Sequence, residues 1–212
     1  MLSMIKTQPT SLPVELEEVK KYLRVDESED DSEILSMINV ATRRVEAHID
    51  KKIITQAWSV FYDRFPTRMK NDWWDGVKEM AISELTGAQR HIVLPFGNLK
   101  SIESFYTYDN QDNEIEFDAA NYAIDVSPHY GRVALRQGSV WPTTVLRPIN
   151  GIKITGIYGY DTKLDVPEEI KMAIKMYVSN MYEHRGDQSE IKVPNMALHL
   201  LEPHRYQGLH CG

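Results

Sequence analysis

Residues that could do chemistry are scattered along this 212-residue chain. Catalysis needs a nucleophile beside a base, paired carboxylates in a pocket, or ligands at metal spacing. The sequence contains no phosphate-binding loop, no dinucleotide-binding glycine pattern, no nucleophile elbow and no zinc-protease motif. We therefore predict no catalytic residue, no metal ligand and no cofactor.

Two weaker chemical hypotheses remain as alternatives. Side chains near one end could bind zinc, but their spacings of five and six residues are poor for a metal site. They are His199, His204, His210 and Cys211. A small hydrolase could also assemble its site from dispersed residues. These would be His91, Asp109, Asp125 and His129.

Two adjacent tryptophans, Trp73 and Trp74, are the most unusual local feature. Their neighbours are mostly polar, and one ring can pack inward while the other reaches out. Because tryptophan is enriched in interface hot spots, we consider them candidates for contact with a subunit or partner as well as core anchors. Stacking on nucleic acid is a further alternative, with only Arg64, Arg68 and Lys70 as basic neighbours.

The composition argues against a surface that grips nucleic acid. The chain has 31 acidic residues against 24 Lys and Arg, which gives a net charge of −7. A protein that surrounds DNA without holding it would tolerate such repulsive walls. The lone cysteine, the lack of a secretory signal and the lack of an apolar run of about 20 residues predict an intracellular product without a membrane span.

An acidic joint at residues 27–31 separates a short helix from a long one. Ser28 lies three residues before Asp31, so we expect a capping box at the start of the long helix. The acidic charges also suit the positive end of that helix dipole. A calcium loop is the alternative, but the run contains no glycine and no glutamate closes it at the twelfth position.

Two amphipathic helices are predicted to form the core. The first has apolar residues at three- and four-residue steps: Ile34, Ile38, Ala41, Val45 and Ile49. The second starts at Pro167 and has the same period: Ile170, Ala173, Ile174, Tyr177, Val178, Met181 and Tyr182. We expect the two stripes to pack on each other. The last segment, Pro194 to Tyr206, has enough apolar residues for about two helical turns and then an irregular tail.

Between these helices the sequence favours strands. A strand is expected from Ile53 to Tyr62, a short helix within residues 71–90, and several short strands from His91 to Tyr158. We predict an α+β fold: a helical core of two long amphipathic helices plus short ones, with an inserted antiparallel β-sheet or small sandwich. The divisions are 1–52 for the N-terminal helices, 53–160 for the insertion and 161–212 for the C-terminal helices and tail.

The order of several segments resembles the head-to-tail connector proteins of long-tailed bacteriophages, also called adaptor or head completion proteins. The segments are LEEVKKYLRVDESEDDSEI, ATRRVEAHIDKKIITQAW, LPFGNLKSIESFYTYD, YAIDVSPHYGRVAL, GIKITGIYGY, VPEEIKMAIKMYVSNMYEHRGD and VPNMALHLLEPHRY. Residues 68–90 are longer than the family's usual link between strands, so the resemblance does not assign them a role.

The resemblance implies a structural virion protein without enzyme activity. It would form a ring, with twelve subunits as the expected number, beneath the portal protein at the head-tail neck of a phage or prophage particle. Double-stranded DNA would pass through the channel without specific binding, and a downstream neck or tail protein would dock on the ring. Assembly would take place in the cytoplasm of the bacterial host. Another neck or baseplate interaction module is the alternative.

The resemblance also suggests which residues touch partners. The C-terminal element reaches toward the portal in such connectors, which makes these residues portal-contact candidates: Pro194, Met196, Leu198, Leu200, Leu201, Arg205 and Tyr206. We expect that Asn195 to Gly212 can be removed with the fold intact. A ring also requires two distinct apolar patches on each subunit, because one face meets a different face of its neighbour.

Overall fold

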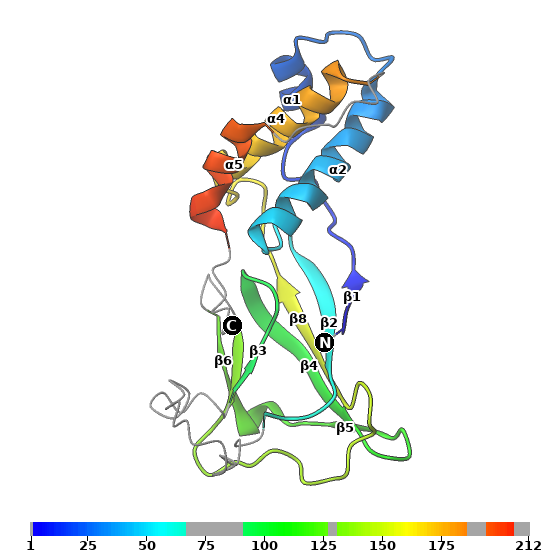
Figure 1. Ribbon diagram of the computed structural model, residues 1–212, viewed down its shortest axis with the longest axis vertical. Helices are drawn as coiled ribbons and strands as arrows, with labels where there is room; N and C mark the ends of the chain where they lie inside the picture. Colours follow the sequence, from blue (N-terminus) through cyan, green and yellow to red (C-terminus); the bar gives the residue numbers. More distant parts are fainter. Residues whose placement is uncertain (1, 67–90, 127–130, 186–193, 206–212) are drawn as a thin grey trace, which may run out of the picture.

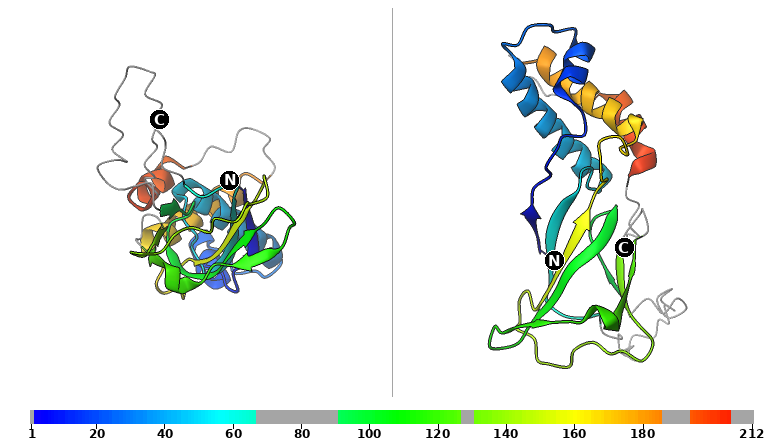
Figure 2. Two further views of the ribbon diagram at one scale, coloured as in Figure 1. Left: turned by 90° about the horizontal axis from the view of Figure 1, so that it is seen from below. Right: turned by 180° about the vertical axis from the view of Figure 1, so that it is seen from behind.

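The computed structural model describes residues 2–66, 91–126, 131–185 and 194–205. Within these ranges the molecule is elongated, with a helical body at one end and two antiparallel sheets at the other (Figure 1). The same two-part arrangement is clear from behind in Figure 2. The predicted α+β class is confirmed.

The helical body is built from four α-helices in the described ranges. They are α1 (Leu16–Leu23), α2 (Asp31–Ile49), α4 (Glu168–Glu183) and α5 (Asn195–Leu201), and a 3-10 turn (Glu202–His204) follows α5. Helix α4 packs against both α2 and α5. The two amphipathic stripes therefore meet, as their period predicted.

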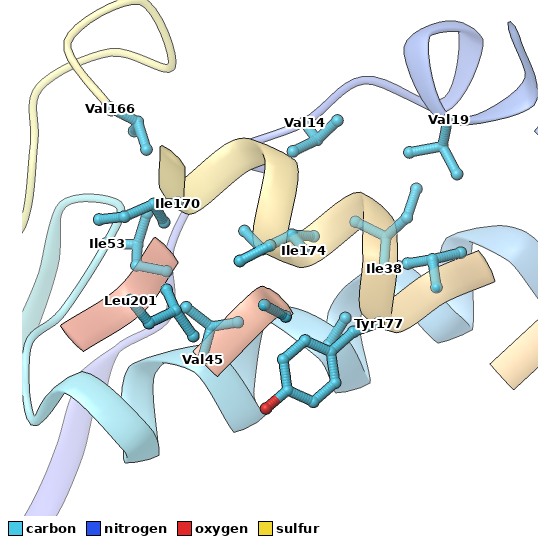
Figure 3. Packing of buried hydrophobic residues seen from close by; sticks show 14 of the residues in the cluster. Val14, Val19, Ile38, Val45, Ile53, Val166, Ile170, Ile174, Tyr177 and Leu201 are labelled. Atoms are coloured by element: carbon cyan, nitrogen blue, oxygen red, sulfur yellow. The ribbon is translucent and has the colours of Figure 1, made fainter. Parts of the chain in front are cut away.

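The core of the helical body is mostly aliphatic. Figure 3 shows Val45 of α2 beside Leu201 of α5, with Ile38 of α2 and Ile174 of α4 in the same cluster. All but two residues of the two predicted stripes are buried in this cluster: Ile34, Ile38, Ala41, Val45, Ile49, Ile170, Ala173, Ile174, Tyr177 and Val178. Met181 and Tyr182 are partly buried against it.

The β part contains a five-stranded and a three-stranded sheet. The first has the order β1 (Leu2–Thr7), β2 (Gln56–Tyr62), β8 (Ile152–Tyr158), β4 (Leu99–Tyr108) and β5 (Glu114–Glu116), all antiparallel. The second has the order β3 (His91–Val93), β7 (Arg132–Leu135) and β6 (Tyr122–Asp125), with a 3-10 turn (Ala119–Asn121) before β6.

An aromatic core joins the two sheets. Phe105 of β4 is 1% exposed, and its ring centre lies 5.1 Å from that of Phe117 and 5.5 Å from that of Tyr122. On the neighbouring strand the ring of Tyr158 covers Gly156, where a Cβ atom would lie 2.8 Å from it. The predicted antiparallel β part is therefore present, and β2 and β8 connect it to the helices.

Three details differ from the sequence-based expectations. Residues 2–7 form a strand of the five-stranded sheet, whereas only helices were expected before residue 53. The strand expected from Ile53 begins at Gln56, because Ile53 and Ile54 are buried in the helical core. Ser28 does not cap α2: the N-cap is Asp30, and the Ser28 backbone carbonyl accepts the Asp31 N–H.

Some predictions concern residues outside the described ranges. These are the contacts of Trp73 and Trp74, the helix within residues 71–90, the role of residues 68–90, the portal contact of Tyr206, and the chemistry of His129, His210 and Cys211.

Candidate assembly surfaces

Helix α5 presents part of the predicted portal-contact set to solvent. Met196 is 59% exposed, while Leu198 and Leu200 are half-buried. Leu201, by contrast, is completely buried among α2 and α4 residues, together with Ala197. Leu201 therefore packs the helical core of the monomer. Pro194 is half-buried and Arg205 is exposed at the two ends of the segment.

This packing changes which part of the tail can be removed. Deleting residues from Asn195 onward would take Ala197 and Leu201 out of the core and leave a cavity beside α4. Contrary to the expectation from the sequence, we therefore expect such a deletion to destabilise the fold. His204, whose Nε2 lies 3.6 Å from the Glu169 carboxylate of α4, adds a contact at the end of the segment.

A second surface lies at the opposite end of the molecule, in the loop between β7 and β8 at the bottom of Figure 1. Three of its aliphatic side chains are strongly exposed: Val140 at 72%, Val145 at 71% and Ile149 at 69%. We call these three residues the tip patch. Isolated exposed aliphatic residues are ordinary, and three in one loop make this loop a candidate contact surface.

Neighbouring side chains hold the tip loop in place. The Trp141 ring stacks on Phe65 with centres 4.8 Å apart, and the Arg147 guanidinium lies over the Tyr108 ring at 3.9 Å. Arg147 also donates to the Asn150 carbonyl at 2.9 Å. The loop is thus anchored by its aromatic and cationic residues while its aliphatic residues point to solvent.

A buried polar cluster joins the helical body to the sheets. One Glu46 carboxylate oxygen on α2 accepts the Ile53 N–H at 2.9 Å and the Gln56 side-chain amide at 2.8 Å. Burial raises the pKa of Glu46, although these hydrogen bonds and the Lys52 charge oppose that shift. Glu46 thereby fixes the position at which the chain leaves α2 for β2.

Lys52 completes this joint. Its ammonium lies 3.8 Å from the Glu46 carboxylate, 4.2 Å from the Trp58 ring centre and 4.3 Å from that of Phe96. Burial lowers the pKa of Lys52. Because the cation contacts residues of α2, β2 and the β3–β4 connection, it ties the two parts of the molecule together.

A groove of about 620 Å³ runs beside the joint. It lies between the connection from β1 to α1 and the face of α2 that carries Arg43 and Glu46, and Trp58 and Ile5 form part of its wall. Burial explains the shifted pKa values of the acid and base in it, Glu46 and Lys52, and the charge of each opposes the shift of the other. The groove therefore gives no support to a catalytic pocket.

The ends of α2 and α4 are held by a smaller cluster. The Tyr182 hydroxyl donates to the Asp30 carboxylate at 2.6 Å, and Arg185 donates to the same oxygen at 3.1 Å. The Tyr182 hydrogen bond, followed by Arg185, lowers the pKa of Asp30. This cluster fixes the acidic joint that follows α1.

The residues of the hydrolase hypothesis do not gather into one site. The Asp109 carboxylate accepts the backbone N–H groups of Gln111 and Asn113 and so stabilises the turn after β4. Asp125 of β6 accepts from Arg132 at 3.0 Å, and His91 lies two strands away on β3. Burial, with the Arg132 charge, lowers the pKa of His91.

Metal sites and membrane spans are both absent from the described part of the chain. No group of three or more His, Cys, Asp or Glu residues in these ranges could hold a metal ion, and this includes His199 and His204. None of the helices in the described ranges has both the length and the apolar character needed to span a bilayer.

The N-terminal third of the sequence matches a known protein family. Residues 13–84 match the family of phage gp6-like head-tail connector proteins, a range that includes α1, α2 and β2. The resemblance to head-tail connectors is confirmed. None of the proteins with a curated description matches the sequence.

Similar solved structures cover the whole chain. One comes from the neck of an empty gene transfer agent (GTA) particle computed with C6 symmetry, with a TM-score of 0.77 and 16% identity. Another comes from the virion of the native GTA particle, with a TM-score of 0.77 and 15% identity. A third comes from the neck of the native particle computed with C12 symmetry, with a TM-score of 0.74 and 16% identity.

The alignments cover 100% of this chain and 99% of each of these chains. The helical body with its β part is therefore a fold shared along the whole of this chain with proteins of GTA particles.

Sequence reasoning missed three features of these surfaces. The strand β1, the Glu46–Lys52 joint and the tip patch were not predicted. The alternation of Leu2 and Met4 is a weak strand signal. Valines and an isoleucine among prolines in residues 139–149 could have indicated an exposed apolar loop. No local pattern shows that Glu46 and Lys52 become buried.

Proposed function

We propose that this chain is the connector subunit of the head-tail neck in a phage-like particle. Copies form a ring, with twelve as the expected number, that extends the DNA channel below the portal and offers a docking surface to the next neck or tail protein. The match of residues 13–84 to head-tail connectors is the observation that carries this proposal. The full-length similarity to GTA neck proteins supports it.

The placement of exposed apolar residues fits two different partners. Met196 lies on α5 in the helical body, whereas the tip patch lies at the far end of the β part (Figure 1). We assign the α5 surface to the portal and the tip patch to the downstream neck or tail protein. The overall charge of −7 suits a channel that DNA passes without specific binding.

We further propose that the chain has no catalytic role and that it assembles in the bacterial cytoplasm before it joins the virion neck. The proposal of no catalysis rests on the turn-stabilising role of Asp109 and on the Asp125–Arg132 pair. Each of these carboxylates already has a structural partner.

The test is binding of the purified chain to portal rings of the same particle. We expect Met196→Asp to weaken binding about tenfold or more, because a Met side chain that is buried on binding contributes about 1.5–3 kcal/mol. Val40→Asp on α2 is the matched control, since Val40 is 46% exposed on a helix but lies outside the proposed contact.

Cosedimentation with portal rings measures both variants. Unchanged binding of the Met196→Asp protein would show that α5 does not contact the portal. A wild-type chain that binds no portal ring at all would contradict the connector role and favour a different neck or baseplate module.

A further inference from the structure

Strand β1 forms an open, apolar edge of the five-stranded sheet. It pairs with β2 on one side, from Leu2 opposite Phe61 to Thr7 opposite Ala57, and the sheet order ends there. Leu2 is 48%, Met4 55% and Ile5 39% exposed. Residues 2–7 belong to neither of the two core clusters. The monomer therefore gains little from the apolar character of this strand.

The strand is nevertheless held in place. Its ladder with β2 is five residue pairs long, and the Lys6 ammonium forms an ion pair with Glu103 of β4 at 2.6 Å. The Lys6 side chain thus reaches across the sheet to a strand that is not its neighbour. An edge strand that is fixed yet exposed offers a ready template for a further strand.

Soluble proteins usually protect such edges. Charged side chains, prolines and bulges on the edge strand prevent pairing with another chain. In β1 the lysine and the bulge both lie at the end, between Ile5 and Thr7. Residues 2–5 carry no charge and no proline. This half of the edge is left open to β-strand addition.

The charge distribution indicates what binds there. Residues 1–14 include one lysine and none of the 31 acidic residues of a chain whose net charge is −7. The groove that includes Ile5 is lined by charges of both signs, Arg43 and Lys52 with Glu46. Residues 1–14, which include no acidic residue, therefore do not repel a second copy of the chain, whose net charge is −7.

We propose that the Leu2–Ile5 edge is a subunit interface, where β1 adds to a strand of the neighbouring copy. The proposal rests on the ring inferred above and names the contact that builds it. Such a contact is heterologous, since β1 of one copy meets a different element of the next, and heterologous contacts generate rings. The similar GTA neck structures were computed with cyclic symmetry.

The experiment compares ring formation by three forms of the full-length chain, alone and with portal rings, using light scattering and negative-stain imaging. Leu2→Lys with Met4→Lys places two charges on exposed side chains of one strand face. The control, Val140→Lys with Val145→Lys, places the same charges on the more exposed tip patch. We expect the β1 variant to lose ring formation and the control to keep it.

Hydrogen exchange provides the second measurement. In wild-type rings, the outward amides of residues 2–5 should exchange more slowly than in the monomeric β1 variant, while α2 should exchange alike in both. Far-UV circular dichroism of the β1 variant should match that of wild type, because both side chains are exposed.

The possible outcomes separate this interface from the connector role. Rings that form normally from the β1 variant would overturn this interface and leave the connector role standing. Rings that form, alone or on the portal, while residues 2–5 exchange as fast as in the monomeric β1 variant would also overturn it, because the edge would then be open in the ring. Wild-type protein that stays monomeric even with portal would overturn the connector role itself, and this interface with it.

Discussion

The helical body and the β part of this protein are stabilised by different chemistry. The helical core consists mainly of Ile, Val and Ala side chains from α2 and α4, with Tyr177 at its border. The β core combines aliphatic side chains with a group of aromatic rings that surround Phe105. The helical core could therefore be predicted from a local repeat, whereas the β core is assembled from residues far apart in the chain.

The two halves also differ in what they leave exposed. The strongest aliphatic exposure in the β part lies in the tip patch, and β1 adds an open edge. The helical body exposes Met196 and the outer side of α2. The joint of Glu46 and Lys52 connects the halves, so a change in one should be felt in the other.

The largest expected effect comes from removing a core side chain in either half. Phe105→Ala should lower the free energy of unfolding by about 3–5 kcal/mol and Ile38→Ala by about 2–5 kcal/mol. Because the joint couples the halves, we expect each variant to shift one cooperative transition. Denaturant unfolding followed by near-UV dichroism for the rings and far-UV dichroism for the helices measures this.

Ile115→Ala on β5 and Leu35→Ala on α2 are the controls, since these side chains are 42% and 37% exposed. They should change stability by about 0.5 kcal/mol or less. If Phe105→Ala moved only the near-UV transition, the two halves would be independent units and the joint would not couple them.

A smaller effect is expected at the joint. The pKa of Glu46 is raised above its ordinary value of 4.5, so the folded state holds the proton more tightly than the unfolded state. The stability that the Glu46 carboxyl contributes is present below pH 4.5 and is lost as the pH rises through the raised pKa. Relative to Glu46→Gln, the wild type should therefore become less stable as the pH rises from about 4 to about 7.

Urea unfolding of both proteins across this pH range measures the change, and Glu17→Gln, an exposed position on α1, reports the effect of charge removal alone. A stability difference between wild type and Glu46→Gln that is constant with pH would mean that Glu46 does not titrate in this range.

The smallest expected effect lies at the ends of α2 and α4. Tyr182→Phe removes the hydroxyl that contributes most to the lowered pKa of Asp30. Because its pKa is lowered, the ionised Asp30 carboxylate stabilises the fold at pH values above the ordinary pKa of 3.8. This stability is lost as the pH falls through the lowered pKa. The advantage of wild type over Tyr182→Phe should thus be present at about pH 7 and shrink toward about pH 3.

Thermal melts at both pH values measure this difference, with Tyr22→Phe as the control because Tyr22 is 40% exposed on α1. A wild-type advantage that grows in acid would contradict the role assigned to Asp30.

The sequence alone determined the helical half. The apolar stripes of α2 and α4 repeat every three or four residues, so their burial could be predicted from positions such as Ile38 and Ile174. The same reasoning predicted α5 and the succession of strands, and the order of segments along the chain was enough to indicate the connector family.

Only the tertiary structure decided the surfaces. Strand β1 exists because residues 2–7 pair with β2, which lies far along the chain, and no local pattern reports such a partner. Leu201 was predicted to face the portal but lies in the core, because the seven-residue helix α5 packs on α4. From the sequence, Glu46 and Lys52 would be assigned to the surface because both are charged. Folding buries them at the joint because a partner and hydrogen bonds are available there.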